Sequence, residues 1–67
     1  MSKTFEIVER VGISTESATE AIKNAVLEAN KDQKVAWFEV AEQRGRVTSD
    51  GKVEFQVTVK IGRKIND

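Results

Sequence analysis

The stretch from Lys52 to Ile61 alternates between polar and apolar residues without a break. Successive side chains of a β-strand point to opposite faces, so this period of two predicts a strand with one face on a hydrophobic layer. Its apolar residues are Val53, Phe55, Val57, Val59 and Ile61. We expect the strand to span residues 52–62, and its five apolar side chains require a second layer of structure to cover them.

Two further strands are predicted on either side of the chain's one helical pattern. Asp50-Gly51 is a strong turn dipeptide, and it joins the alternating strand to an earlier β-rich run at residues 35–47, which predicts a hairpin. Residues 3–11 also alternate and end at Gly12, which predicts a first strand.

The covering layer is predicted to be a helix at residues 15–30. Ser14 offers a capping hydroxyl, and Glu16 would lie in the first turn, where a carboxylate suits the helix dipole. The apolar residues recur at helical spacing and are mostly alanine, which favours close packing on a sheet. They are Ala18, Ala21, Ile22, Ala25, Val26 and Ala29. The predicted class is α+β: one domain over residues 1–67, in the order β–α–β–β, with one helix on one face of a three-stranded antiparallel sheet.

Trp37 and Phe38 are adjacent in the second predicted strand, so they cannot both face the helix. Phe38 shares its phase with Val40, and this apolar pair is expected to join the helix-facing layer. Trp37 then falls on the outer face, in phase with Glu39 and Gln43. A large aromatic is thereby left on the side that a monomer would expose to water.

Three interpretations of Trp37 remain open from the pattern alone. It could be buried between subunits, because aromatic residues are enriched in interface cores. It could be a stacking surface for a flat ligand. It could also be an incidental exposed aromatic. A nucleobase platform is disfavoured because Glu39 and Glu42 lie on the same strand and no basic cluster surrounds the ring.

The composition excludes several kinds of reactive group and argues against several kinds of partner. The chain has 67 residues and no cysteine or histidine, which excludes disulfides, thiolate chemistry and the commonest general base. Eleven basic and eleven acidic residues are mixed along the chain, so we expect no nucleic-acid partner. No run of signal-peptide or membrane-spanning length occurs, and we expect a cytoplasmic protein with no membrane contact. A domain this small is marginally stable alone, so self-association is expected.

Several short motifs together resemble the dodecins, a family of small flavin-binding proteins. They are Val11-Gly12 before a Ser/Thr-rich helix start, WFEV at residues 37–40, Arg44-Gly45, FQV at residues 55–57 and VKIG at residues 59–62. The resemblance extends over essentially the whole chain, and the order and spacing of the motifs carry it.

The resemblance implies a strongly bent sheet and a hollow homododecamer that stores flavin as stacked pairs. The flavin would be riboflavin, FMN or FAD, and stacking would quench its excited state. Trp37 matches the family's stacking residue, and Gln56 would hold the polar pyrimidine edge of the ring. Main-chain groups of Val35 and Ala36 would supply further contacts.

Other positions depart from the family pattern or carry weaker implications. Many relatives have an aspartate where this chain has Ala36. Lys64 stands at the place of an arginine linked to the flavin phosphate or to coenzyme A, and lysine lacks that residue's bidentate fork. Arg44 would form an ion pair with Glu39 or Glu42 of a neighbouring subunit, or reach the flavin phosphate. Lys3 is the residue carried over for coenzyme A.

The predicted function is therefore flavin storage without catalysis. Glu39 and Glu42 are expected on opposite faces of their strand, so they would not form a catalytic carboxylate pair, and we expect no metal site. For Arg63 and Lys64, a solvated tail and a site both remain open. Two alternatives to flavin storage remain: a flavin-free shell that binds coenzyme A or ions, and a redox flavoprotein.

Overall fold

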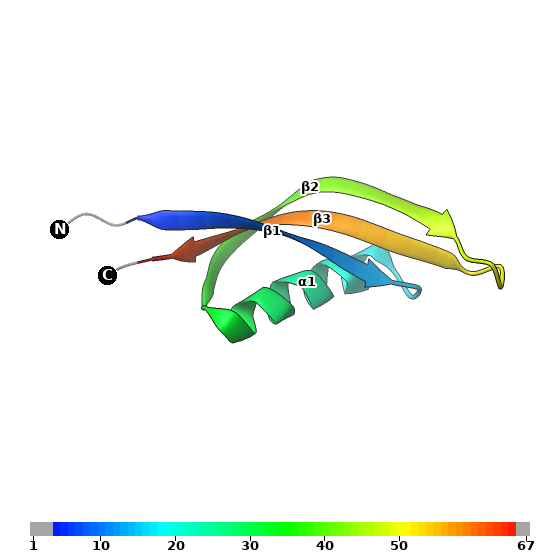
Figure 1. Cartoon of the computed structure of the whole chain (residues 1–67), viewed down its shortest axis with the longest axis horizontal. Coiled ribbons are helices and arrows are strands. Elements are labelled where there is room, and N and C mark those ends of the chain that lie inside the picture. Colours follow the sequence, from blue (N-terminus) through cyan, green and yellow to red (C-terminus); the bar gives the residue numbers. More distant parts are fainter. Residues whose placement is uncertain (1–3, 66–67) are drawn as a thin grey trace.

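The computed structural model describes residues 4–65. It has the predicted element order, β1 (Phe5–Ser14), α1 (Ala18–Asp32), β2 (Val35–Val47) and β3 (Val53–Lys64). The three strands form one antiparallel sheet in the order β1-β3-β2, so β3 is central and β1 and β2 are the edges. The sheet curves over α1, which covers one of its faces, and the β2–β3 hairpin projects past the helix (Figure 1). The predicted α+β class, the antiparallel sheet and the β2–β3 hairpin are confirmed.

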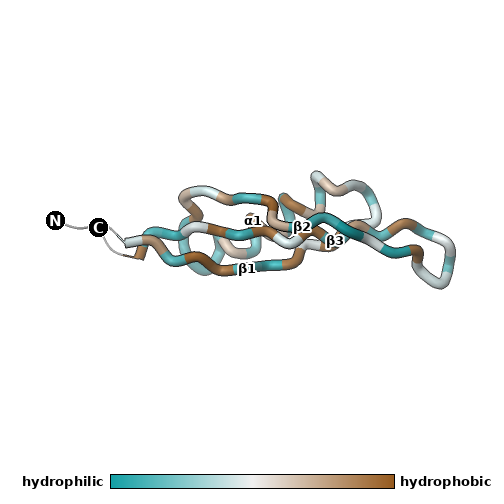
Figure 2. Tube along the Cα trace, turned by 90° about the horizontal axis from the view of Figure 1, so that it is seen from above, coloured by the Kyte–Doolittle hydropathy of each residue, from teal (hydrophilic) through white to brown (hydrophobic). Residues whose placement is uncertain are grey.

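The helix lies close to the sheet because its contact face is made of alanine. Ala21, Ala25 and Ala29 are buried at intervals of four residues against Val57, Val59 and Ile61 of β3. Gly12 of β1 allows the closest approach, because a Cβ at that position would overlap the backbone carbonyl of Ala21. Hydrophobic and hydrophilic segments alternate along the strands, as Figure 2 shows.

Several predicted boundaries need correction. β1 continues past Gly12 to Ser14, because that glycine is the helix contact and not the end of the strand. The helix begins at Ala18 with Ser17 as its N-cap, whose Oγ accepts a hydrogen bond from the Glu20 amide at 3.0 Å. Ser14 Oγ instead accepts a hydrogen bond from the Glu16 amide in a turn before the helix. The predictions of Ser14 as the N-cap and of Glu16 as a first-turn residue are therefore wrong. Glu20 is the acidic residue of the first turn.

The hairpin turn follows its predicted chemistry. Gly51 has a φ of 86°, a conformation that glycine adopts at little cost. Thr48 closes the turn, since its amide donates to the Lys52 carbonyl at 2.7 Å and its Oγ1 accepts from the Lys52 amide at 3.0 Å.

A single chain is too extended to be a compact monomer. Its radius of gyration is 13.8 Å, whereas a compact domain of this length would have about 11 Å. The chain measures 53 × 19 × 15 Å, and many of its large apolar side chains are exposed. They lie on both faces of the sheet and on the helix, and examples are Ile7 and Ile13 of β1, Phe38 and Val40 of β2, and Leu27 of α1.

Candidate ligand-binding site

Trp37 lies on the sheet face that α1 leaves uncovered, here called the outer face. The strand register sets it opposite Gly62, while Phe38 lies opposite Ile61, which is fully buried in the helix-facing core. Phe38 also lines a small apolar hollow of about 140 Å³ together with helix residues, Ile22 and Val26 among them. The predicted division of the two aromatics is confirmed. Trp37 retains 41% exposure and is available to a ligand or to another subunit.

The indole of Trp37 rests on the backbone of β3. A Cβ added to Gly62 would overlap three of its ring atoms, Cε2, Cζ2 and Nε1. Ile7 of β1 is the other register partner of Gly62. Ile7, Gly62 and Trp37 therefore form one row across the outer face, with the glycine in the middle.

Three of the other predicted site residues gather near the start of β2. Val35, Ala36 and Lys64 line one pocket of about 300 Å³ together with Gln33 and Lys34. The pocket is braced by Gln33, whose Nε2 donates to the Lys64 carbonyl at 2.6 Å. With two lysines at its wall, it is suited to an anionic group.

The main-chain contacts predicted for Val35 are already partly used. Its amide N–H donates to Asn30 Oδ1 at 2.8 Å, so it is not free to reach a ligand. Ala36 is the extra residue of a β-bulge between Val35 and Trp37, on an edge strand of the sheet. Lys3, predicted for coenzyme A, lies outside the described residues.

Gln56 and Arg44 lie far from Trp37 in the same chain. They are register partners, and Gln56 is six positions before Gly62 along β3, which corresponds to about 20 Å. Gln56 shares the outer face with Trp37, and its Nε2 donates to Glu54 Oε1 at 3.0 Å. One chain therefore supplies two separate halves of the predicted site.

Glu54 is held by two partners on this part of the outer face. Besides Gln56, Arg46 Nε donates to its Oε1 at 2.9 Å. The hydrogen bond from Gln56, and after it the one from Arg46, hold the pKa of the Glu54 carboxyl below its ordinary value. The amide of Gln56 is thus oriented by a neighbouring carboxylate.

A second bulge corrects the predicted phase of β2. The register shifts between Val40 and Glu42, so Ala41 is an extra residue and strict alternation fails there. Gln43 consequently pairs with Val57 on the helix-facing side, so the prediction that it shares a face with Trp37 is wrong. Glu42 pairs with Thr58 on the outer face, so it shares that face with Glu39, contrary to prediction.

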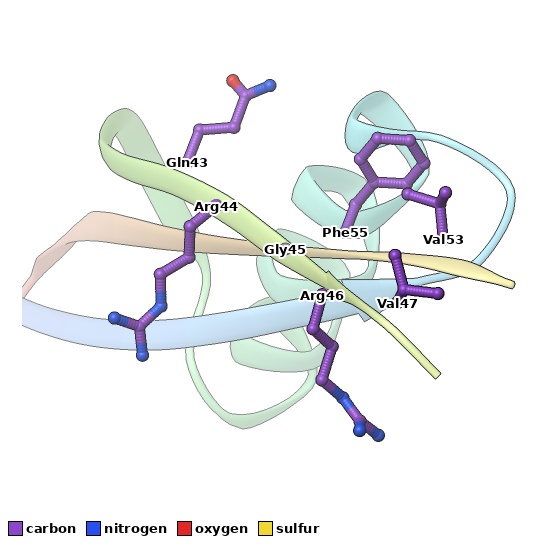
Figure 3. A pocket seen from close by; sticks show the side chains of 7 residues that line it. All are labelled: Gln43, Arg44, Gly45, Arg46, Val47, Val53 and Phe55. Atoms are coloured by element: carbon purple, nitrogen blue, oxygen red, sulfur yellow. The ribbon is translucent and has the colours of Figure 1, made fainter. Parts of the chain in front are cut away.

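The same bulge sets the direction of the two arginines. Figure 3 shows Gln43 and Phe55 projecting to one side of the hairpin, and Arg44 and Arg46 to the other. Residues 43–47 of β2, together with Val53 and Phe55 of β3, line a hollow of about 380 Å³ that was not predicted from the sequence. Gly45 is required there, because a Cβ on it would overlap the Glu54 carbonyl.

Arg63 is structural, which corrects the expectation of a solvated tail or a site. Its side chain is 8% exposed and lies between Asp32 at the end of α1 and Glu6 of β1. Nη1 donates to Asp32 Oδ2 at 3.2 Å, and Nη2 donates to Glu6 Oε1 at 3.1 Å. Arg63 thereby links α1 and β1 to β3.

Two further properties concern the part of the chain that the structure describes. Within residues 4–65, no group of three or more His, Cys, Asp or Glu side chains is arranged to hold a metal ion. The helix in the same range is neither long nor apolar enough to cross a membrane.

Comparison with known proteins places this geometry in a family. The family model described as Dodecin matches residues 4–66. The chain belongs to the dodecin family. A curated dodecin from Thermus thermophilus is 37% identical over 68 residues, covering 100% of this chain and 99% of the relative. Dodecins are small dodecameric binding proteins, and membership supports self-assembly of this chain.

Solved dodecin structures share the whole fold. A single-residue variant of the Thermus thermophilus dodecin is 36% identical, with a TM-score of 0.88 and 98% of each chain covered. The dodecin from Streptomyces davaonensis is 31% identical, with a TM-score of 0.88 and 100% of each chain covered. A calcium dodecin from Mycobacterium tuberculosis, at 23% identity and a TM-score of 0.84, shows the common fold alone.

Proposed function

We propose that this dodecin binds and stores a flavin (riboflavin, FMN or FAD) by stacking the isoalloxazine ring on Trp37. The observation that carries the proposal is the position of the indole, which lies exposed on the outer face and is supported from below by Gly62. A flat, electron-poor tricycle stacks well on indole, and such aromatic pairs contribute about 0.5–1.5 kcal/mol beyond burial. Close stacking also quenches the excited flavin.

The polar edge of the ring would be held by Gln56 of a neighbouring copy. The amide has both donor and acceptor atoms, as the pyrimidine edge requires. Because the Gln56 of the same chain is about 20 Å from the Trp37 row, it cannot serve the same ring. Flavin binding therefore depends on assembly.

The pocket at the start of β2, which two lysines line, suits the phosphate of FMN or FAD. Val35, Ala36 and Lys64 line it, and Lys34 adds a second ammonium group. Arg44 lies opposite Gln56, far from Trp37 of the same chain, so it would reach the flavin on that tryptophan only across a subunit boundary. An ion pair with Glu39 or Glu42 of a neighbouring copy is its alternative role. We thus expect FMN to bind more tightly than riboflavin.

Assembly into a homododecameric shell would cover the surface that one chain leaves exposed. The fully buried core is small and half of it is alanine, whereas apolar side chains on both faces of the sheet remain accessible. The extended shape leads to the same conclusion. We propose no catalytic role, because the feature that carries the proposal is a stacking surface for the ring.

The test is a fluorescence titration of riboflavin and FMN with ligand-free protein, using the fraction that size-exclusion chromatography shows to be assembled. We expect strong quenching that saturates near one flavin per chain, with tighter binding of FMN. Unquenched flavin at saturating concentrations of an intact shell would refute flavin storage. A dodecin shell that carries coenzyme A or ions would then be the remaining alternative, and calorimetric titration with these ligands would distinguish them.

A further inference from the structure

The indole of Trp37 meets Gly62 with its face and not with its edge. Of the ring atoms, Cε2 would lie nearest a Cβ on Gly62, followed by Cζ2 and Nε1, which are both bonded to Cε2. An atom that approached this side of the ring in its own plane would meet Cζ2 and Nε1 before Cε2. The observed order therefore means that a Cβ on Gly62 would lie against the face of the ring.

Only glycine leaves room for this contact. Trp37 and Gly62 are direct register partners, and partners on one face of an antiparallel pair have their Cβ atoms about 4.5–5.5 Å apart. The indole extends across β3 into the volume that a side chain of residue 62 would occupy. The register continues from this pair to Phe38 and Ile61, and the bulge at Ala36 lies on the other side of Trp37, where it shifts only Val35.

The row ends at Ile7, whose exposed side chain lies on the far side of Gly62 from Trp37. It is one of the apolar residues that β1 presents on the outer face. A bulkier residue 62 would therefore have to displace the indole outward, because the backbone of β3 lies below and the row is occupied on both sides.

We propose that Gly62 is a positioning residue for ligand stacking: it seats one face of the Trp37 indole on the backbone of β3 and leaves the opposite face for one flat ring. This inference rests on the proposed flavin-binding function. Gly62 itself does not touch the flavin. Because Gly62 has no side chain, the indole can lie directly on the backbone of β3, which sets its height and tilt. Trp37 is then a stacking surface on one side only.

The variant Gly62→Ala tests the proposal, with Thr58→Ala as a control on the same face of β3, two rows away. We expect Gly62→Ala to assemble, to change the near-ultraviolet circular dichroism of Trp37, and to raise the Kd for FMN about tenfold, a loss of roughly the size of one stacking contact. Thr58→Ala should match the unmodified protein in all three measurements. An assembled Gly62→Ala shell with unchanged FMN affinity would overturn the proposal.

A second measurement needs no variant at residue 62 and no flavin. The chain has four glycines, so a glycine-labelled protein gives a simple NMR spectrum. Protons above the face of an aromatic ring are shielded, so the Gly62 Hα resonances should be displaced upfield, and Trp37→Ala should return them to ordinary positions. If the Gly62 Hα chemical shifts of the unmodified protein are ordinary, the proposal is overturned. This test remains valid even if Gly62→Ala fails to assemble.

These results separate the two claims. If the Gly62 resonances are displaced and no flavin binds, the contact between Trp37 and Gly62 is confirmed but the proposed flavin-binding function is wrong. Gly62 then has no role in ligand stacking. If flavin binds through Trp37 and Gly62→Ala binds equally well, flavin storage stands and the positioning role of Gly62 is wrong.

Discussion

Trp37 and Gln56 project from the same face of one sheet, yet they are separated by about 20 Å along β3. The separation follows from the register, because Trp37 pairs with Gly62 and Gln56 pairs with Arg44. A ligand that contacts both residue types must therefore lie between two copies of the chain.

Hybrid shells test this arrangement. We expect shells co-assembled from Trp37→Ala and Gln56→Ala chains to contain some sites with full affinity, because Trp37 of one variant can meet Gln56 of the other. Flavin titrations of the hybrid and of each single-variant shell check this. If hybrid shells contain only the weak sites of the two parent shells, Trp37 and Gln56 do not act across a subunit boundary.

Gln56→Ala alone should weaken flavin binding less than loss of the stack. A hydrogen bond to the ring edge would be left unmade, at a cost of about 1–2 kcal/mol. Calorimetric titration of assembled protein measures the loss. An unchanged affinity would show that the pyrimidine edge is held by another group.

The ionisation of Glu54 should respond to its two partners. Gln56 and then Arg46 hold the pKa of this carboxyl below its ordinary value. The interaction therefore stabilises the folded chain above the unfolded-state pKa and is lost as pH falls through the lower folded-state pKa. We expect Gln56→Ala to raise the pKa of Glu54, as followed by carboxyl NMR. Thr58→Ala is the control and should leave it in place. An unchanged pKa in Gln56→Ala would contradict the assigned cause.

Arg63 should contribute to stability through the pairing of a buried charge. The double change Glu6→Gln and Asp32→Asn leaves the guanidinium buried without counter-charges, so we expect a loss of about 3–5 kcal/mol in unfolding free energy. Arg63→Met leaves two carboxylates that water can reach, and should cost less than about 2 kcal/mol. Urea denaturation measures the unfolding free energies of the two variants. A larger loss of unfolding free energy in Arg63→Met than in the double variant would contradict this account.

The sequence was sufficient for the fold because its strongest signals are local. The alternation that ends at Ile61 predicts the central strand, Asp50-Gly51 predicts the hairpin, and the alanine stripe predicts the packed helix. The same alternation in β3, combined with the apolar pair Phe38 and Val40, placed Trp37 correctly on the outer face. Each of these patterns depends on residues that are close together in the chain, so it can be read directly from the sequence.

The errors arose where the structure departs from regular geometry. The bulge at Ala41 adds one residue to β2, so every residue after it changes face, and Gln43 and Glu42 were misplaced. The burial of Arg63 between Glu6 and Asp32 is not predicted by either of its two interpretations, because these partners are distant in sequence. A glycine within a strand often marks a close approach, so Gly62 was the one signal that could have revealed the seat of the indole.

The most direct test of the central claim is the affinity of assembled Trp37→Ala shells for FMN, measured beside Phe38→Ala shells. Both changes remove one aromatic ring from adjacent positions of β2, but only Trp37 lies on the outer face. We predict that Trp37→Ala shells lose most of their FMN affinity and quenching, by at least tenfold in Kd, and that assembled Phe38→Ala shells keep both. Binding to Trp37→Ala shells as tight as to the unmodified protein would contradict the stacking role.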